Sequence, residues 1–129
     1  MEEEDNKKMM GEVTEEELTK VLHSFQKGKS PGTNGWLIEF FLGFYDLVGG
    51  DLLKVVEESR IAGHVHGPVN ATFLAHIPKK DNLEGFDDFR PISLCNCLYK
   101  IISKVIAQRL KVVLSQNISS EQFGFLEGR

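Results

Sequence analysis

The sequence predicts an α+β fold: three helices, then a two-stranded antiparallel hairpin, then one long helix. Two short apolar runs, Ala71–Pro78 and Phe89–Leu94, flank a polar loop and predict the hairpin. Apolar residues at helical spacing predict helices before it and a longer one, about Asn96 to Ser115, after it. With 129 residues, 41% of them hydrophobic and 26% charged, the chain suits one globular domain.

The first expected helix begins at Thr14. Residues 1–13 are charged and lack apolar periodicity, so we expect a disordered acidic tail there. Thr14 and Glu17 form the pattern of a capping box, with Thr14 as N-cap. Leu18, Val21, Leu22 and Phe25 then share one helical face, and Gly28 is the expected stop. The remaining residues, 14–129, would make up the folded domain.

Two more helices are expected before the hairpin. Residues 36–48, from Trp36 onward, are dense in apolar and aromatic side chains, which indicates a helix packed on more than one side. We interpret them as core, and an aromatic box for a base or cofactor is the alternative. Gly49-Gly50 would end this helix, and Asp51 would cap the next, which ends at Gly63.

The long C-terminal helix combines a buried stripe with a basic side. Its apolar residues follow the three-and-four spacing of one face, whereas Lys100, Lys104 and Lys111 recur elsewhere around it. These lysines would either be solvated or contact a nucleic-acid backbone.

Charge is distributed unevenly along the chain. The net charge is −4, which argues against a general polyanion binder, yet residues 90–111 hold five bases and no acid. No run of eighteen apolar residues predicts a membrane span, and the acidic start is unlike a secretory signal, so we expect an intracellular protein. Cys95 and Cys97 have no partner cluster, so we expect reduced cysteines and no metal site.

Two further groups of residues suggest contact with phosphate. Lys79 and Lys80 leave the first strand of the hairpin and Arg90 enters the second, so the hairpin would hold these cations at one end. Upstream, Lys29-Ser-Pro-Gly-Thr-Asn-Gly35 is a strong turn segment whose glycines allow close approach to a ligand. Solvated strand ends and a plain surface loop are the alternatives.

Several of these segments together resemble the fingers region of reverse transcriptases from non-LTR (LINE-type) retrotransposons, most closely those of plants. The resemblance covers roughly residues 14–129, with five motifs in the family's order. The matching segments are Lys29-Ser-Pro-Gly-Thr-Asn-Gly35, Asn70-Ala-Thr-Phe-Leu-Ala-His-Ile-Pro-Lys-Lys80, Phe89-Arg-Pro-Ile-Ser-Leu-Cys95, Tyr99-Lys-Ile-Ile-Ser-Lys-Val105 and Gln122-Phe-Gly-Phe-Leu-Glu-Gly-Arg129.

The resemblance implies contacts with RNA template and primer and with a deoxynucleoside triphosphate. Arg90 and one lysine of the Lys79-Lys80 pair would bind the triphosphate, and either lysine fits the family pattern. The loop residues Lys29, Pro31, Gly32 and Gly35 would lie near the template. In that loop the family usually has Pro-Gly-x-Asp-Gly, and Asn34 stands here in place of the aspartate.

The family's metal-binding aspartates have no counterpart among these motifs. In the family, Mg²⁺ is held by aspartates downstream of the Gln122–Arg129 motif, and the sequence contains no Tyr-x-Asp-Asp. We therefore assign no catalytic residue and no cofactor, and expect a segment truncated before the palm and inactive alone.

Two other expectations follow from the resemblance. Surface that meets the palm in an intact enzyme would be exposed here, which predicts self-association. Nuclear residence would follow only from the life cycle of such an element. The alternative function is a small module that binds RNA or a protein partner.

Overall fold

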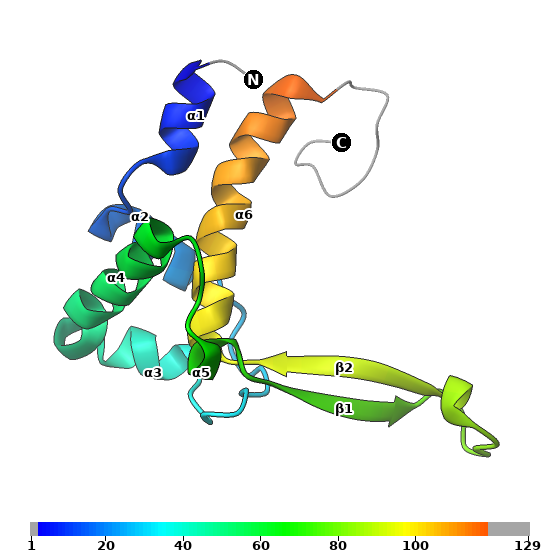
Figure 1. Cartoon of the computed structure of the whole chain (residues 1–129). Helices are drawn as coiled ribbons and strands as arrows, with labels where there is room; N and C mark the ends of the chain where they lie inside the picture. Colours follow the sequence, from blue (N-terminus) through cyan, green and yellow to red (C-terminus); the bar gives the residue numbers. More distant parts are fainter. Residues whose placement is uncertain (1–2, 119–129) are drawn as a thin grey trace.

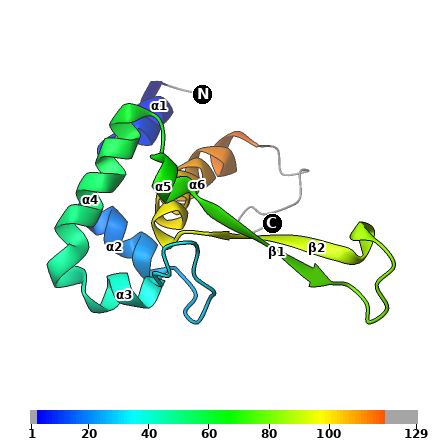
Figure 2. The same cartoon turned by 60° about the horizontal axis from the view of Figure 1, so that its bottom comes forward.

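The computed structural model describes residues 3–118, which form a body of helices and one projecting β-hairpin (Figures 1 and 2). The fold class is α+β, as predicted. In chain order the elements are α1 (Glu3–Met10), α2 (Glu15–His23), α3 (Ile38–Gly43), α4 (Tyr45–Ala62), the one-turn α5 (Gly67–Asn70), β1 (Thr72–Pro78), the 3-10 turn η1 (Phe86–Asp88), β2 (Phe89–Cys95) and α6 (Cys97–Asn117).

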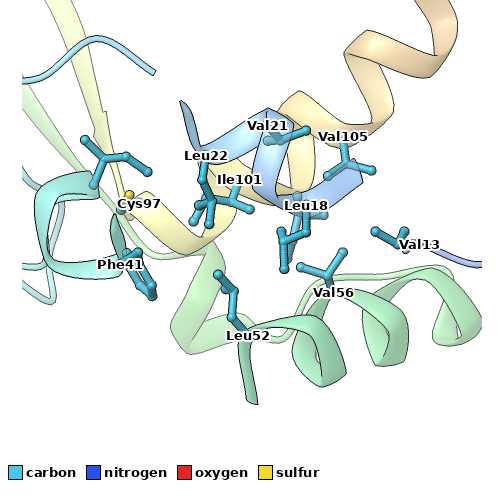
Figure 3. Close-up of a cluster of buried hydrophobic side chains, with 12 residues drawn as sticks. Val13, Leu18, Val21, Leu22, Phe41, Leu52, Val56, Cys97, Ile101 and Val105 are labelled. Atoms are coloured by element: carbon cyan, nitrogen blue, oxygen red, sulfur yellow. The ribbon is translucent and has the colours of Figure 1, made fainter. Parts of the chain in front are cut away.

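The hydrophobic core lies between α2, α3, α4 and α6 (Figure 3). Leu18, Val21 and Leu22 of α2 are fully buried, as their spacing predicts, and so is Ile101 of α6. The stripe predicted on α6 is only partly inside, because Ile106 is 53% exposed. The core therefore fixes the N-terminal half of α6, where the candidate lysines Lys100 and Lys104 lie.

The start of α2 uses half of the predicted capping box. The backbone N–H of Glu17 donates to Thr14 Oγ1 at 3.2 Å, which caps the helix. The Glu17 carboxylate instead accepts two hydrogen bonds from Arg109 of α6, each 2.7 Å long. This long-range pair therefore replaces the local return contact of a capping box.

The tail expected over residues 1–13 is wrong for residues 3–10, which form α1 against α6. The reason lies far along the chain. The Arg109 guanidinium donates to the carbonyls of Met9, Gly11 and Glu12, and that of Arg60 donates to the carbonyl of Met10. Two arginines thus satisfy carbonyls at the end of α1 and just after it, and no local sequence pattern predicts this.

The boundary between α3 and α4 also differs from the prediction. The break falls at Phe44, and α4 continues through Gly49 and Gly50 until Gly63, which has φ +71° and ends the helix as predicted. A Cβ at Gly49 would lie 2.8 Å from the Tyr45 ring. Gly49 therefore makes room for that ring rather than ending a helix.

The hairpin follows the prediction closely. β1 and β2 are antiparallel, with Phe73 opposite Leu94, Ala75 opposite Ile92 and Ile77 opposite Arg90. β2 leads through Asn96 directly into α6. No helix within residues 3–118 is both long and apolar enough to cross a membrane. The motif at residues 122–129 lies outside the described part of the chain.

Candidate nucleic-acid interface

The structure brings two of the predicted groups together in one pocket of about 380 Å³. Its lining includes Lys29 and Pro31 of the glycine-rich loop and Lys100 and Lys104 of α6. Among residues 3–118, no acidic side chain lines this pocket. Its other lining residues are Ser24, Phe25, Gln26, Ser30, Trp36, Leu37, Ile38 and Cys97. The pocket thus joins a loop and a helix that are about seventy positions apart in the sequence.

Asn96 holds the loop in this place. Its side-chain oxygen accepts hydrogen bonds from Thr33 Oγ1 at 3.1 Å and from the backbone N–H of Asn34 at 3.0 Å. Its amide nitrogen donates to the carbonyls of Pro68 and Val69 at 3.1 and 3.3 Å. Asn96 is 1% exposed, so these bonds form away from solvent. The sequence pattern indicates Asn96 only as the start of a helix, and its partners in the loop could not be read from it.

Two of the four loop residues predicted to lie near a template serve the fold instead. Gly32 is buried against the backbone of Asn96, where a Cβ would lie 2.4 Å from the amide nitrogen. Gly35 has φ +73°, and its N–H donates to the Gly32 carbonyl at 3.1 Å to close a turn. Asn34 Oδ1 accepts from the backbone N–H of Trp36 at 3.1 Å, so the asparagine shapes this turn.

The three lysines of the pocket differ in their partners. Lys104 Nζ donates to the Ser24 carbonyl at 2.8 Å and lies 4.3 Å from the centre of the Phe25 ring. Within residues 3–118, the side-chain ammonium groups of Lys29 and Lys100 have no hydrogen-bond or ion-pair partner. Lys104 therefore forms part of the pocket wall, whereas the ammonium groups of Lys29 and Lys100 are available to bind a ligand.

Besides the lysines, Cys97 is a titratable group that lines the pocket, and Glu39 lies near it. Burial raises the pKa of the Cys97 thiol to about 11, although the nearby Lys100 charge acts in the opposite direction. The pKa of Glu39 is lowered, chiefly because the backbone N–H of Gly28 donates to its carboxylate at 2.6 Å. Cys97 is thus a neutral part of the pocket floor, and Glu39 anchors the chain that leads into the loop.

The other predicted cations belong to the hairpin, whose tip projects away from the helices (Figures 1 and 2). Lys79 Nζ donates to the Asp87 carbonyl at 2.7 Å, and Lys80 Nζ pairs with Asp88 Oδ1 at 3.0 Å. In the described residues, the Arg90 guanidinium has no such partner. The two lysines are therefore held by the loop itself, whereas Arg90 is available.

Asp88 organises the loop at the tip. Besides Lys80, its carboxylate accepts the backbone N–H groups of Glu84 and Gly85, at 2.7 and 3.1 Å. These bonds lower the pKa of the Asp88 carboxyl, and the bond from the Glu84 N–H has the largest effect. No local sequence pattern indicates this role for Asp88.

The remaining predicted phosphate contact, Lys111, lies neither in the pocket lining nor at the hairpin tip. It follows later on α6. Among residues 3–118, no three side chains of histidine, cysteine, aspartate or glutamate gather where they could hold a metal ion.

The described part of the chain is thus a small α+β domain in which three lysines line one pocket. Residues 77–129, which include β2 and α6, match the sequence model of the family described as reverse transcriptase (RNA-dependent DNA polymerase).

A relative covers most of the chain. Over 117 residues, 91% of this chain, the sequence is 37% identical to the uncharacterized 149 kDa protein of transposon TX1 from Xenopus laevis. The chain spans 9% of the length of that protein. The sequence is therefore reverse-transcriptase-like and similar to a transposon protein.

Proposed function

We propose that this chain forms the fingers segment of an RNA-directed DNA polymerase from a LINE-type retrotransposon, of the kind found in plants. Its own task would be to bind nucleic acid beside the polymerase centre. The family match over residues 77–129 and the relative from a transposon support this proposal. The motifs around Lys79, Arg90 and Lys100 support the finer assignment by resemblance.

The pocket beside α6 is the observation that carries the proposal. Lys29, Lys100 and Lys104 place three positive charges around one cavity, and no acid lines it in the described part of the chain. The hairpin tip is less favourable for a polyanion, because residues 79–90 contain four acids and three bases. Electrostatic attraction therefore favours the pocket as the main contact with a nucleic-acid backbone.

The hairpin would contribute a second, smaller contact, to the triphosphate of an incoming nucleotide. Arg90 offers a planar fork of donors that suits phosphate oxygens. Arg90 lies opposite Ile77, and strand alternation puts Lys79, two residues later, on the same face. This geometry favours Lys79 over Lys80 as the partner of Arg90. Mg²⁺ would be held by residues outside the assigned motifs, and no step of the chemistry is assigned to this chain.

Binding of single-stranded RNA as a function of salt tests the proposal. A fluorescently labelled oligonucleotide is titrated with the full chain, and the logarithm of the association constant is plotted against that of the salt concentration. The double variant Lys29→Ala/Lys100→Ala should reduce the slope by about 1.4, since each single-strand phosphate contact contributes about 0.7. The triple variant Lys79→Ala/Lys80→Ala/Arg90→Ala should leave most of this slope.

A matched control separates local contacts from net charge. Lys54 is an exposed lysine of α4 that does not line the pocket, so Lys54→Ala removes one charge elsewhere. Its slope should equal that of the wild type. Binding that is absent at low salt, or that weakens equally when any lysine is removed, would contradict the proposal.

A protein-binding module is the second candidate, and one observation favours it. One face of the hairpin carries Phe73, Ile77 and Ile92, which are 55%, 46% and 40% exposed. Such a face can drive self-association or bind a partner. Sedimentation velocity over a range of concentrations tests this. A constant sedimentation coefficient would exclude self-association, and Phe73→Asp should abolish any association that occurs.

A further inference from the structure

Trp36 presents an aromatic surface in the cationic pocket. It lines the pocket and is 47% exposed, and it also borders a second cavity beside Phe41 and Val48. Its ring packs edge-on against Phe40, with centroids 4.5 Å apart, and lies 5.8 Å from Phe41. Its backbone N–H is held by Asn34 Oδ1. The indole is therefore positioned by neighbours on one side and open to a ligand on another.

Phe25, the other aromatic residue in the described lining of the pocket, already contacts a cation. The Phe25 ring has the Lys104 ammonium 4.3 Å from its centre, which covers one of its faces. Within residues 3–118, the Trp36 indole N–H donates no hydrogen bond. Lys29 and Lys100 are likewise without a partner there, in the same pocket. An open indole beside two unpaired ammonium groups suits a ligand with a flat ring and a phosphate.

We propose that this pocket binds one unpaired nucleotide of a single strand, with its base stacked on Trp36 and its phosphate at Lys29 or Lys100. The volume of about 380 Å³ suits one nucleotide and lies within the range of about 300–1,000 Å³ that is usual for small ligands. A paired base in a duplex offers no free face, so the pocket selects single strands. This inference rests on the proposed function and adds a base contact to its phosphate contacts.

The chain contains one tryptophan, so its fluorescence reports on this pocket directly. The full chain is titrated with a uridine oligonucleotide, with an abasic ribose-phosphate strand of the same length, and with a duplex. Stacking should quench the fluorescence with the uridine strand and not with the abasic strand. The abasic strand should bind roughly tenfold more weakly, the loss expected for one stacked base.

Substitutions at Trp36 separate stacking from packing. Trp36→Leu keeps an apolar side chain on the core side and should weaken the uridine strand roughly tenfold, with the abasic strand unchanged. Trp36→Phe should restore most of the affinity. Phe86→Leu is the matched control, because Phe86 is 95% exposed at the hairpin tip. Circular dichroism and thermal unfolding establish that each variant is folded.

Two results would overturn the inference, and they differ in their meaning. If the uridine and abasic strands bind equally and Trp36→Leu changes neither, the pocket binds phosphate only, and the proposed function stands without a base contact. If no strand binds even at low salt, the proposed function itself fails.

Discussion

Gly32 lies against the backbone of Asn96 so closely that a Cβ at Gly32 would stand 2.4 Å from the Asn96 amide nitrogen. The two residues join the glycine-rich loop to the start of α6. Because Asn96 also binds Thr33 and Asn34, the loop is fixed at this point and not free. This contact brings Lys29 into one pocket with two lysines of α6.

Gly32→Ala should destabilise the protein by about 1–3 kcal/mol, since the added methyl group meets backbone that cannot move aside. It should also weaken RNA binding, because the loop that carries Lys29 must shift. Gly50→Ala is the matched control. Gly50 lies inside α4 with open space around its Cβ position, so alanine should stabilise by about 0.5–1 kcal/mol. Urea unfolding measures both, and effects of equal sign would contradict this account.

Arg109→Ala should destabilise the protein by about 1.5–3 kcal/mol, because it removes the bonds to the Glu17 carboxylate and to carbonyls at the end of α1 and just after it. Amide hydrogen exchange in residues 3–10 should accelerate more than in α4. The control is Lys20→Ala, which breaks an exposed pair with Glu16 and should change stability by less than about 0.5 kcal/mol. If the amide hydrogen exchange of α1 is the same in the Arg109→Ala variant as in the wild type, Arg109 does not stabilise α1.

Cys97 should resist thiol reagents in the folded protein, whereas the partly exposed Cys95 should react. Burial raises the pKa of Cys97 to about 11, so the reactive thiolate is scarce near neutral pH. A chromogenic disulfide reagent should therefore titrate one thiol per native chain and both in denaturant. Cys95→Ala should leave no rapidly reacting thiol in the native protein.

The same shift predicts a loss of stability in alkali. The folded pKa of Cys97 lies above the ordinary value of 9.0, so this contribution is complete below pH 9 and declines as pH rises toward 11. Cys97→Ala should remove that part of the pH dependence. An identical alkaline decline in the variant would contradict the assignment.

The hairpin tip should lose its order in acid. The pKa of Asp88 is lowered from its ordinary value of 3.8, so the folded loop is favoured above that pH and loses this contribution as pH falls through the lower folded value. The amide signals of Glu84 and Gly85 should shift together in an NMR titration. Asp88→Asn should abolish this transition, and Asp81→Asn, in the same loop, should not.

The sequence alone predicts what local patterns determine. The N-cap at Thr14, the paired strands and most of α6 are found where their turn residues and apolar spacing indicate. The prediction fails at α1, which Arg109 holds from far along the chain. It also fails at Gly49, which stays inside α4 because the ring of Tyr45, one turn earlier, packs against it. Arg109 lies about a hundred positions from the carbonyls that it binds.

The candidate site shows the same division. Residue types identify Lys29, Lys100 and Lys104 as candidates for phosphate contact, yet nothing local indicates that they share a pocket. Asn96 could have been found from its position, because a polar residue between a strand and a buried helix needs hydrogen-bond partners. The sequence pattern places Trp36 among residues interpreted as core, and only the structure reveals that its side chain is exposed and could contact a ligand.

Lysine reactivity in the presence of RNA tests the central claim most directly. The chain is acetylated briefly with and without a saturating single-stranded RNA, and each lysine is quantified by mass spectrometry. Lys29 and Lys100 should be protected several-fold in the complex, while Lys54 on α4 should react equally in both samples. Protection confined to Lys79 and Lys80 at the hairpin tip, or no difference at Lys29 and Lys100 while RNA is bound, would contradict the pocket as the nucleic-acid interface.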